Sequence, residues 1–209
     1  MFRVRTLLIA GAILLGLCGL AFVQASAGLV QAYAINGGSM EPTLLIGDYL
    51  ITRPLTARDV PRGTIVTLRP PTDRNAVWLK RVAAAGGDRV RFENKTLILN
   101  GQRQNEPYAI HVTSYVDPFR DNWPQRPESA LPLSNGWGDY IAQHMVNGEI
   151  VVPPGKYFVL GDNRDDSLDS RYFGFLDRSE LESTPVMIYN SIDRAHGWKV
   201  RWDRLFHRL

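Results

Sequence analysis

Ser39 lies in the stretch GGSMEPTL, residues 37–44, directly after a long run of uncharged residues. A serine hydroxyl is a weak nucleophile until a neighbouring base takes its proton. Histidine is the familiar base, but no histidine of this chain stands in a motif that would pair it with a serine. We interpret the four histidines as surface or packing residues: His111, His144, His196 and His207. Lysine is then the alternative base.

Lys80 is the best lysine candidate for that base. A free lysine has a pKa of about 10.4, and burial among apolar groups can lower it by about 3–5 units. Lys80 stands in VWLKRVAAAGG, residues 77–87, which reads as a strand. Alternation places Lys80 on the face of Trp78 and Arg81 on the opposite face, so one basic side chain turns inward. A solvated lysine at a strand edge is the alternative, and solvated or tail positions are expected for the others: Lys95, Lys156 and Lys199.

A second polar stretch, LGDNRDDSLDSRYFGF at residues 160–175, packs four aspartates, two serines and two arginines into one loop after a strand. Such crowding is typical of a loop that fixes its own shape through Asp–Arg pairs, which are bidentate where geometry allows. Either Ser167 or Ser170 would offer a hydroxyl to orient a lysine amine, the third group that a nucleophile and its base require.

These stretches resemble, in order and spacing, the signature boxes of bacterial type I signal peptidases. The matching segments are SMEPTL (39–44), GD (47–48), KRV (80–82), GD (87–88) and GDNRDDSLDSRYFG (161–174). The resemblance runs from about residue 33 to the end of the chain, and its last box is the most specific.

The resemblance implies hydrolysis of exported preproteins after small residues (Ala-x-Ala), with Ser39 as nucleophile and Lys80 as general base. It needs no cofactor and no metal, and the chain has no His/Cys cluster with metal-ligand spacing. The resemblance also assigns further roles: Ser167 to orienting the amine, Asp169 and Arg171 to a salt-bridged pair, Arg81 to their support, and Ile35, Met40 and Leu79 to shallow substrate pockets.

Gly37 departs from the family pattern. Some relatives place a serine two positions before the nucleophile, where its hydroxyl joins the Ser39 backbone N–H in stabilising the oxyanion. Loss of one such donor costs about 10²–10³ in rate in other enzymes.

Short β-rich runs must position these residues, so the sequence predicts a mainly β, antiparallel catalytic body. Strands are expected at residues 48–55, 64–69, 77–82, 157–160 and 186–192, with a hairpin over 89–99 and one helical turn at 178–182. Residues 101–148 are rich in Pro, Asn, Gln and aromatics, and are expected to form an inserted cap-like subdomain between body segments 33–100 and 149–209.

The N-terminus predicts one membrane anchor. No formal charge stands between Arg5 and Glu41, and residues 6–27 are long enough for a bilayer-spanning helix. Arg3 and Arg5 precede it, so residues 1–5 are expected in the cytoplasm and the body on the outer face of the inner membrane. A cleaved secretory signal ending near Ala25-Ser26-Ala27 is the main alternative, and a buried core helix is a weaker one.

Charge and cysteine content narrow the remaining classes. The net charge is +3, without a basic stripe or nucleic-acid motif, so nucleic acid is not an expected partner. One cysteine allows no intrachain disulfide. The expected partners are preproteins that carry signal peptides and membrane lipid, with the enzyme as a monomer. Two other functions stay open: a specialised relative that matures one pilin-like or conjugation protein, and a membrane-anchored β binding module without catalysis.

Overall fold

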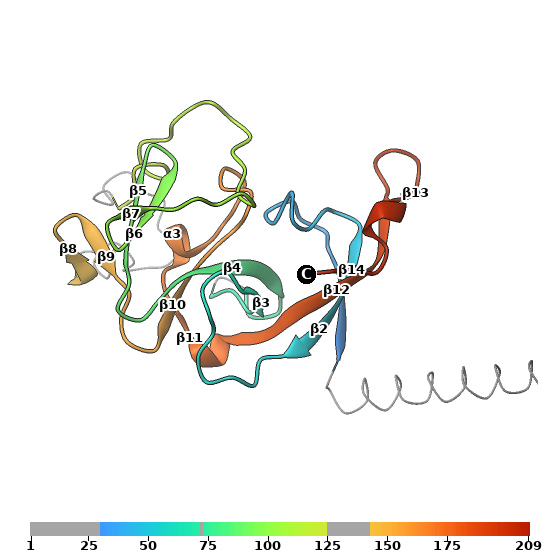
Figure 1. Ribbon diagram of the computed structural model, residues 1–209, viewed down its shortest axis with the longest axis horizontal. Helices are drawn as coiled ribbons and strands as arrows, with labels where there is room; N and C mark the ends of the chain where they lie inside the picture. The colour runs from blue at the N-terminus through green and yellow to red at the C-terminus, as the bar shows by residue number, and fades with distance from the viewer. Residues whose placement is uncertain (1–29, 72, 125–142) are drawn as a thin grey trace, which may run out of the picture.

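The computed structural model describes residues 30–71, 73–124 and 143–209 (Figure 1). These residues include two antiparallel sheets, the short α-helix α3 (Ser170–Phe173), and 3-10 turns at η2 (Arg178–Glu180) and η3 (Trp202–Arg204). The mainly β, antiparallel class predicted from the sequence is therefore confirmed. The predicted anchor at residues 6–27 lies outside the described residues, and within the described ranges no helix is long and apolar enough to cross a bilayer.

The larger sheet positions the three stretches singled out for chemistry, at residues 37–44, 77–87 and 160–175. Its longest strand, β12 (Leu181–Asp193), pairs with β2 (Asp48–Pro54) and β3 (Ile65–Leu68) and bulges beside Pro185. A proline removes a ladder hydrogen bond and is tolerated at such a bulge. The sheet follows the order β1 (Gln31–Ala34), β2 (Asp48–Pro54), β12 (Leu181–Asp193), β3 (Ile65–Leu68), β4 (Trp78–Ala85), β10 (Lys156–Leu160) and β11 (Leu176–Asp177), and β13 (Lys199–Val200) and β14 (His207–Arg208) also pair with β12.

The smaller sheet lies to one side of the larger one (Figure 1). Its core is shared with the larger sheet, because Trp123 packs on Phe158 of β10 with ring centroids 5.1 Å apart. Both aromatic side chains are buried, which ties the two sheets together through apolar contact. Its strands follow the order β7 (Gln102–Arg103), β6 (Thr96–Leu99), β5 (Arg89–Glu93), β9 (Glu149–Val151) and β8 (Met145–Val146).

The strands expected from the sequence all overlap observed strands. The hairpin over 89–99 forms β5 and β6, and the predicted helical turn is the 3-10 turn η2. β12 begins at Leu181, earlier than the expected residue 186, because polar residues and Pro185 hide its start. The smaller sheet draws on strands from both sides of residue 101; the division into a body and an insert at 101–148 stays a prediction.

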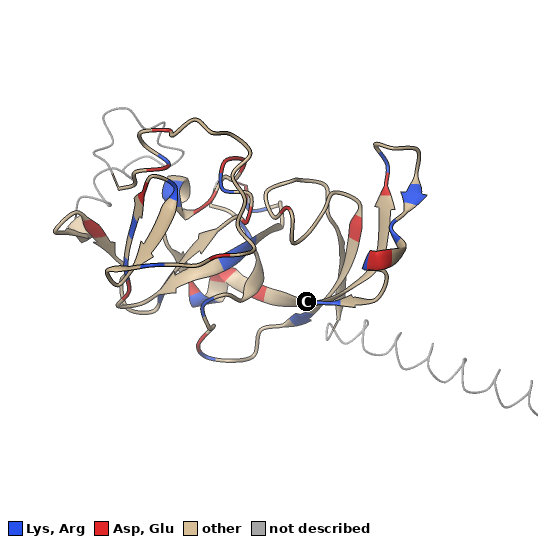
Figure 2. Cartoon of the chain, turned by 45° about the horizontal axis from the view of Figure 1, so that its top comes forward, with Lys and Arg blue, Asp and Glu red and all other residues tan. Residues whose placement is uncertain are grey.

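Positions of Lys and Arg are interspersed with positions of Asp and Glu along the described chain (Figure 2). Many of these residues form ion pairs, such as Arg69 with Glu182 and Arg103 with Glu93. Lys95 corrects an expectation, because its side chain is only 12% exposed and its Nζ lies 3.0 Å from Asp165. Its turn was predicted, but its buried partner is 70 residues away in the sequence and left no local signal.

Candidate active site

Ser39 lies in the connection between β1 and β2. Hydrogen bonds from Ile35 N to Asp48 O (2.8 Å) and from Gly47 N to Ile35 O (2.9 Å) close the base of this connection. The carbonyl of Ser39 accepts a hydrogen bond of 3.1 Å from the backbone N–H of Asn163. The serine is therefore fixed both to its own strands and to the polar loop that follows β10.

Asp48, the first residue of β2, fixes the end of the same connection. Its fully buried carboxylate accepts hydrogen bonds from Leu45 N (2.8 Å), from the Ser191 hydroxyl (2.6 Å) and from the guanidinium of Arg204 (2.5 Å). Gly47 must be glycine here, because its φ is +92° and a Cβ would lie 2.0 Å from the carbonyl oxygen of Ile192. The close backbone contact at Gly47 and the hydrogen bonds of Asp48 explain why glycine and aspartate stand together at this point of the sequence.

Lys80 lies on β4 and points to Ser39. A hydrogen bond of 2.8 Å joins Lys80 Nζ and Ser39 Oγ, across 41 residues of sequence. The lysine is 3% exposed, and its Nζ lies 5.5 Å from the ring centroid of Trp78, on the same face of the strand. The alternation argument thus placed Lys80 and Trp78 correctly.

Burial lowers the pKa of Lys80 from 10.5 to about 8. Loss of water around the charged ammonium is the largest cause. The negative charge of Asp169 acts in the opposite direction and raises this pKa, while the positive charge of Arg171 lowers it again. At neutral pH the uncharged amine is a minor but substantial species, and its share grows as the pH rises through 8.

Asp169 and Arg171 form a buried bidentate pair in the loop after β10. The guanidinium donates two hydrogen bonds of 2.8 Å to the two carboxylate oxygens, and both residues are at most 1% exposed. Burial alone would raise the pKa of Asp169, but the charge and hydrogen bonds of Arg171 hold that pKa below its ordinary value. The carboxylate also accepts from Gly161 N at 3.1 Å, which fixes the start of the loop.

Ser167 is buried in the same loop, close to the connection between β1 and β2 that carries Ser39 (the serine connection). Contact with its hydroxyl helps to lower the pKa of Asp169, but among the described residues its Oγ has no hydrogen bond of ordinary geometry. A Cβ added at Gly161 would lie 2.2 Å from Ser167 Oγ and 2.5 Å from the carbonyl oxygen of Ser39. Gly161 thus allows the two serine-bearing segments to approach each other.

Arg81 points away from Lys80 and binds the first aspartate of the loop. Its guanidinium donates to both oxygens of Asp162 (2.8 and 2.5 Å) and stacks over the ring of Tyr108 at 4.0 Å from the centroid. Thr43 donates to the same carboxylate at 2.5 Å. Arg81 therefore joins the serine connection, β4 and the loop, but nothing in the sequence near Asp162 or Thr43 indicated which residues it would bind.

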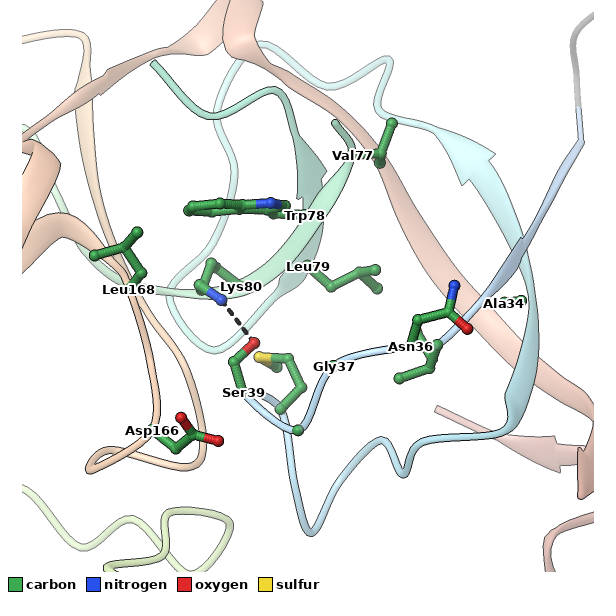
Figure 3. Close-up of a pocket in the computed structure, with 13 residues that line it drawn as sticks. Ala34, Asn36, Gly37, Ser39, Val77, Trp78, Leu79, Lys80, Asp166 and Leu168 are labelled. Carbon is green, nitrogen blue, oxygen red and sulfur yellow. Dashed lines mark hydrogen bonds between the residues drawn. The ribbon is translucent and has the colours of Figure 1, made fainter. Parts of the chain in front are cut away.

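A cleft of about 530 Å³ opens at Ser39 and Lys80 (Figure 3). The three predicted pocket residues line it, with Ile35 and Met40 buried and Leu79 half-buried. Sequence reasoning missed several lining residues, because they come from segments far apart in the chain or carry no motif of their own: Ala34, Asn36, Gly38, Val77, Trp78, Asp166 and Leu168.

Gly37 also lines this cleft, and a Cβ added there would meet no atom within 4 Å. Its φ lies outside the left-handed region, so no backbone strain requires glycine at this position. The space around residue 37 is therefore open to a side chain, in contrast to the crowded surroundings of Gly161.

A buried amine beside a serine hydroxyl at the mouth of a cleft is an arrangement able to activate that hydroxyl for attack on a carbonyl. Among the described residues there is no group of three His, Cys, Asp or Glu side chains arranged to hold a metal ion.

Comparison with known proteins identifies the family of this chain. A family model described as signal peptidase, peptidase S26, matches residues 6–190. A signal peptidase I of Aquifex aeolicus is 31% identical over 198 residues, covering 78% of this chain and 77% of that protein. A signal peptidase IB of Staphylococcus aureus is 31% identical over 163 residues, covering 73% of this chain and 74% of that protein.

Among solved structures, a signal peptidase I from Enterococcus faecalis matches 60% of this chain and 96% of that one, with 29% identity and a TM-score of 0.41. The family match and the two sequence relatives each cover well over two thirds of the chain. The chain belongs to the signal peptidase family of S26 peptidases.

Proposed function

We propose that this protein is a membrane-anchored serine endopeptidase that removes signal peptides from exported preproteins by means of a Ser39–Lys80 dyad. Membership of the S26 family supports the class of reaction. The observation that carries the dyad is the 2.8 Å hydrogen bond between Lys80 Nζ and Ser39 Oγ, at an amine buried enough for its pKa to fall to about 8.

In the first half of the reaction, neutral Lys80 takes the proton of the Ser39 hydroxyl as its oxygen attacks the carbonyl carbon of the residue before the cut. The negative oxygen that forms is stabilised by backbone N–H groups, including that of Ser39. The lysine ammonium then gives its proton to the leaving nitrogen, the peptide bond breaks, and an acyl-enzyme remains on Ser39.

In the second half, the neutral amine of Lys80 takes a proton from water, and the hydroxide attacks the acyl carbon. The bond to Ser39 Oγ breaks, the serine regains a proton from Lys80, and the signal peptide leaves with a free carboxylate. Ser167 is proposed to orient the amine between the two halves, and Arg81 and the Asp169–Arg171 pair to hold the surrounding segments in place.

Cleavage after small residues follows from the apolar walls of the cleft. Ile35, Met40 and Leu79 are apolar lining residues of this cleft, and we propose that they form shallow pockets that accept alanine-sized side chains and exclude larger ones by steric conflict. β1 forms one edge of the larger sheet. An extended substrate is proposed to add as a further strand beside the residues that follow β1.

The proposed location is the inner membrane, with residues 1–5 in the cytoplasm, residues 6–27 as a single anchor, and a monomeric catalytic domain on the outer face. An anchor holds the enzyme at the surface where signal peptides emerge and so raises their effective concentration. The proposed division is a β catalytic domain at 33–100 and 149–209, with a cap-like insert at 101–148.

Cleavage of a defined preprotein by the full chain in detergent tests this proposal. We expect one cut after an Ala-x-Ala sequence, found by sequencing the new N-terminus, and loss of cleavage when either alanine is replaced by phenylalanine. Ser39→Ala should abolish the cut. Ser39-independent cleavage, or no cleavage of any preprotein by a folded enzyme, would contradict it. A panel of preproteins also separates a general enzyme from one that serves a single pilin-like substrate.

A further inference from the structure

The loop after β10 contains four aspartates, and three of them are bound to cations. Asp162 binds Arg81, Asp165 binds Lys95 and Arg120, and Asp169 binds Arg171. Among the described residues, the fourth aspartate, Asp166, has no hydrogen bond or ion pair at its carboxylate. One of these three aspartates thus binds a cation within the loop, two bind cations outside it, and one carboxylate is left available.

The free carboxylate faces the cleft. Asp166 is exposed, lines the cleft together with Ser39 and Lys80, and raises the pKa of Lys80 through its negative charge. Its backbone is held in place by a hydrogen bond of 3.2 Å from its N–H to the carbonyl of Asn163. One carboxylate oxygen lies 3.7 Å from the point where a Cβ of Gly38 would be, next to the nucleophilic serine.

The cleft has two chemically different ends (Figure 3). On one side of the Ser39–Lys80 pair lie Ala34, Asn36 and Val77, and on the other lie Leu168 and Asp166. A peptide that crosses Ser39 places the residues before the cut at one end and those after it at the other. Under the proposed function the end near Ile35 and Leu79 takes the residues before the cut, so the Asp166 end would receive the first residues of the mature chain.

We propose that Asp166 determines which mature N-termini the enzyme cleaves well: it favours a basic residue, and disfavours an acidic one, at the first two positions after the cut. This inference rests on the proposed function. An exposed carboxylate attracts a nearby ammonium or guanidinium and repels a carboxylate, and salt screens both effects. Glu41 adds a second acid close to Gly38, with its Oε1 3.6 Å from the same Cβ position.

The test compares kcat/KM for preproteins that differ only in lysine, glutamine or glutamate at the first or the second mature position. We expect the full-length enzyme to prefer lysine over glutamate by about threefold to tenfold at low salt, in line with exposed charge pairs. The preference should shrink toward unity in about 0.5 M NaCl, which is roughly three times physiological ionic strength.

Asp166→Asn should bring the lysine-to-glutamate ratio close to one, and Asp166→Lys should invert it. A ratio within one enzyme is unaffected by any change in overall rate, so altered basicity of Lys80 does not obscure the result. Asp59→Asn is the matched control, because it removes the same charge from an exposed aspartate that lines a different cavity. It should retain the wild-type ratio.

A wild-type lysine-to-glutamate ratio in Asp166→Asn would overturn the inference and leave the proposed function standing. Loss of that ratio in Glu41→Gln but not in Asp166→Asn would do so too. Equal cleavage of the lysine, glutamine and glutamate substrates by the wild-type enzyme would also overturn the inference and leave the proposed function standing. Failure of every substrate to undergo Ser39-dependent cleavage would overturn the proposed function, and with it this inference.

Discussion

Two buried cations in this protein receive opposite treatment. Arg171 is 1% exposed and is held by a bidentate carboxylate, so the charge of Asp169 raises its pKa even though burial alone would lower it. Lys80 is 3% exposed and its hydrogen-bond partner is a neutral hydroxyl, so burial dominates and its pKa falls to about 8. The contrast shows that a buried cation stays charged when a carboxylate is bound to it and tends to lose its proton when none is.

The two regions also depend on each other. The negative charge of Asp169 raises the pKa of Lys80, and the positive charge of Arg171 opposes that effect. Because Arg171 binds Asp169 directly, the pair presents little net charge to the amine. The salt bridge thus supports the loop and, at the same time, keeps a carboxylate from holding the proton on Lys80.

The largest expected effect comes from removing the uncharged amine. Lys80→Met should lower kcat/KM for a preprotein by at least about 10³-fold, and adding Ser39→Ala should cause little further loss, because groups that act as a unit are not additive. Lys199→Met, at an exposed lysine in β13, is the control and should stay within about twofold of wild type. Substantial cleavage by Lys80→Met would remove this lysine from the mechanism.

Breaking the Asp169–Arg171 ion pair should lower the free energy of unfolding and not only the catalytic rate. Asp169→Ala leaves the guanidinium of Arg171 buried without its counter-ion, which destabilises proteins by about 3–5 kcal/mol. Urea denaturation measures the loss. Glu93→Ala, which breaks an exposed pair with Arg103, should cost less than about 1 kcal/mol. Similar losses for the two variants would show that burial does not distinguish these ion pairs.

Replacing Lys80 should raise the free energy of unfolding, whereas replacing Asp169 lowers it, because the buried ammonium of Lys80 destabilises the fold. Its pKa is about 8 when folded and 10.5 when unfolded, so below pH 8 the folded state carries the full penalty of a buried ammonium. That penalty is about 3 kcal/mol, and it is relieved between pH 8 and 10.5 as the folded state releases its proton. Lys80→Met should therefore be more stable by up to about 3 kcal/mol at pH 7.

The same denaturation experiments at pH 7 and above pH 10 check this sign. The stability difference between wild type and Lys80→Met should shrink at the higher pH. A variant that is less stable than wild type at pH 7, with a difference independent of pH, would contradict an amine that is costly to protonate.

Two glycines extend the comparison to the backbone. Gly161→Ala should reduce kcat about 100-fold, because its Cβ would push Ser167 and Ser39 apart and misplacement by about 1 Å is costly in catalysis. Gly37→Ala is the matched control in open space and should stay near wild type. Equal activity of both alanine variants would show that the close approach at Gly161 is not required.

The smallest expected effect is a gain. Gly37→Ser adds a hydroxyl at an open position of the cleft, and we expect kcat to rise by up to about tenfold through an added oxyanion donor. Single-turnover measurements separate this chemical step from substrate binding. A rate that falls, or that matches Gly37→Ala, would contradict a missing donor at this position.

Much of the fold was predictable because strand periodicity is a local property. The runs that became β2, β3, β4 and β10 each alternate or carry β-branched residues, and the hairpin of β5 and β6 surrounds a short polar turn. Strand order was not predictable, since it depends on contacts between distant segments. α3 was missed because one turn of four residues, with its N-cap Asp169 already bound to Arg171, leaves no helical period.

The site was predictable where chemistry restricts the residue type. Alternation along β4 placed Lys80 and Arg81 on opposite faces, and the structure brings Lys80 to Ser39 and Arg81 to Asp162. The hydroxyl–amine contact for Ser167 stays a prediction. Asp166 and Gly161 were missed because their importance lies in what they face, and no local pattern reports a free carboxylate or a close backbone approach.

The pKa of the Lys80 amine tests the central claim most directly. The chain has only four lysines, so the Nζ resonances of ¹⁵N-lysine-labelled protein can be assigned with the Lys80→Met variant. We expect the resonance that is missing from the variant to titrate near pH 8 in the wild-type protein. A midpoint near 10.5 for that resonance would mean that the amine is ordinarily protonated, and would contradict its role as the base for Ser39.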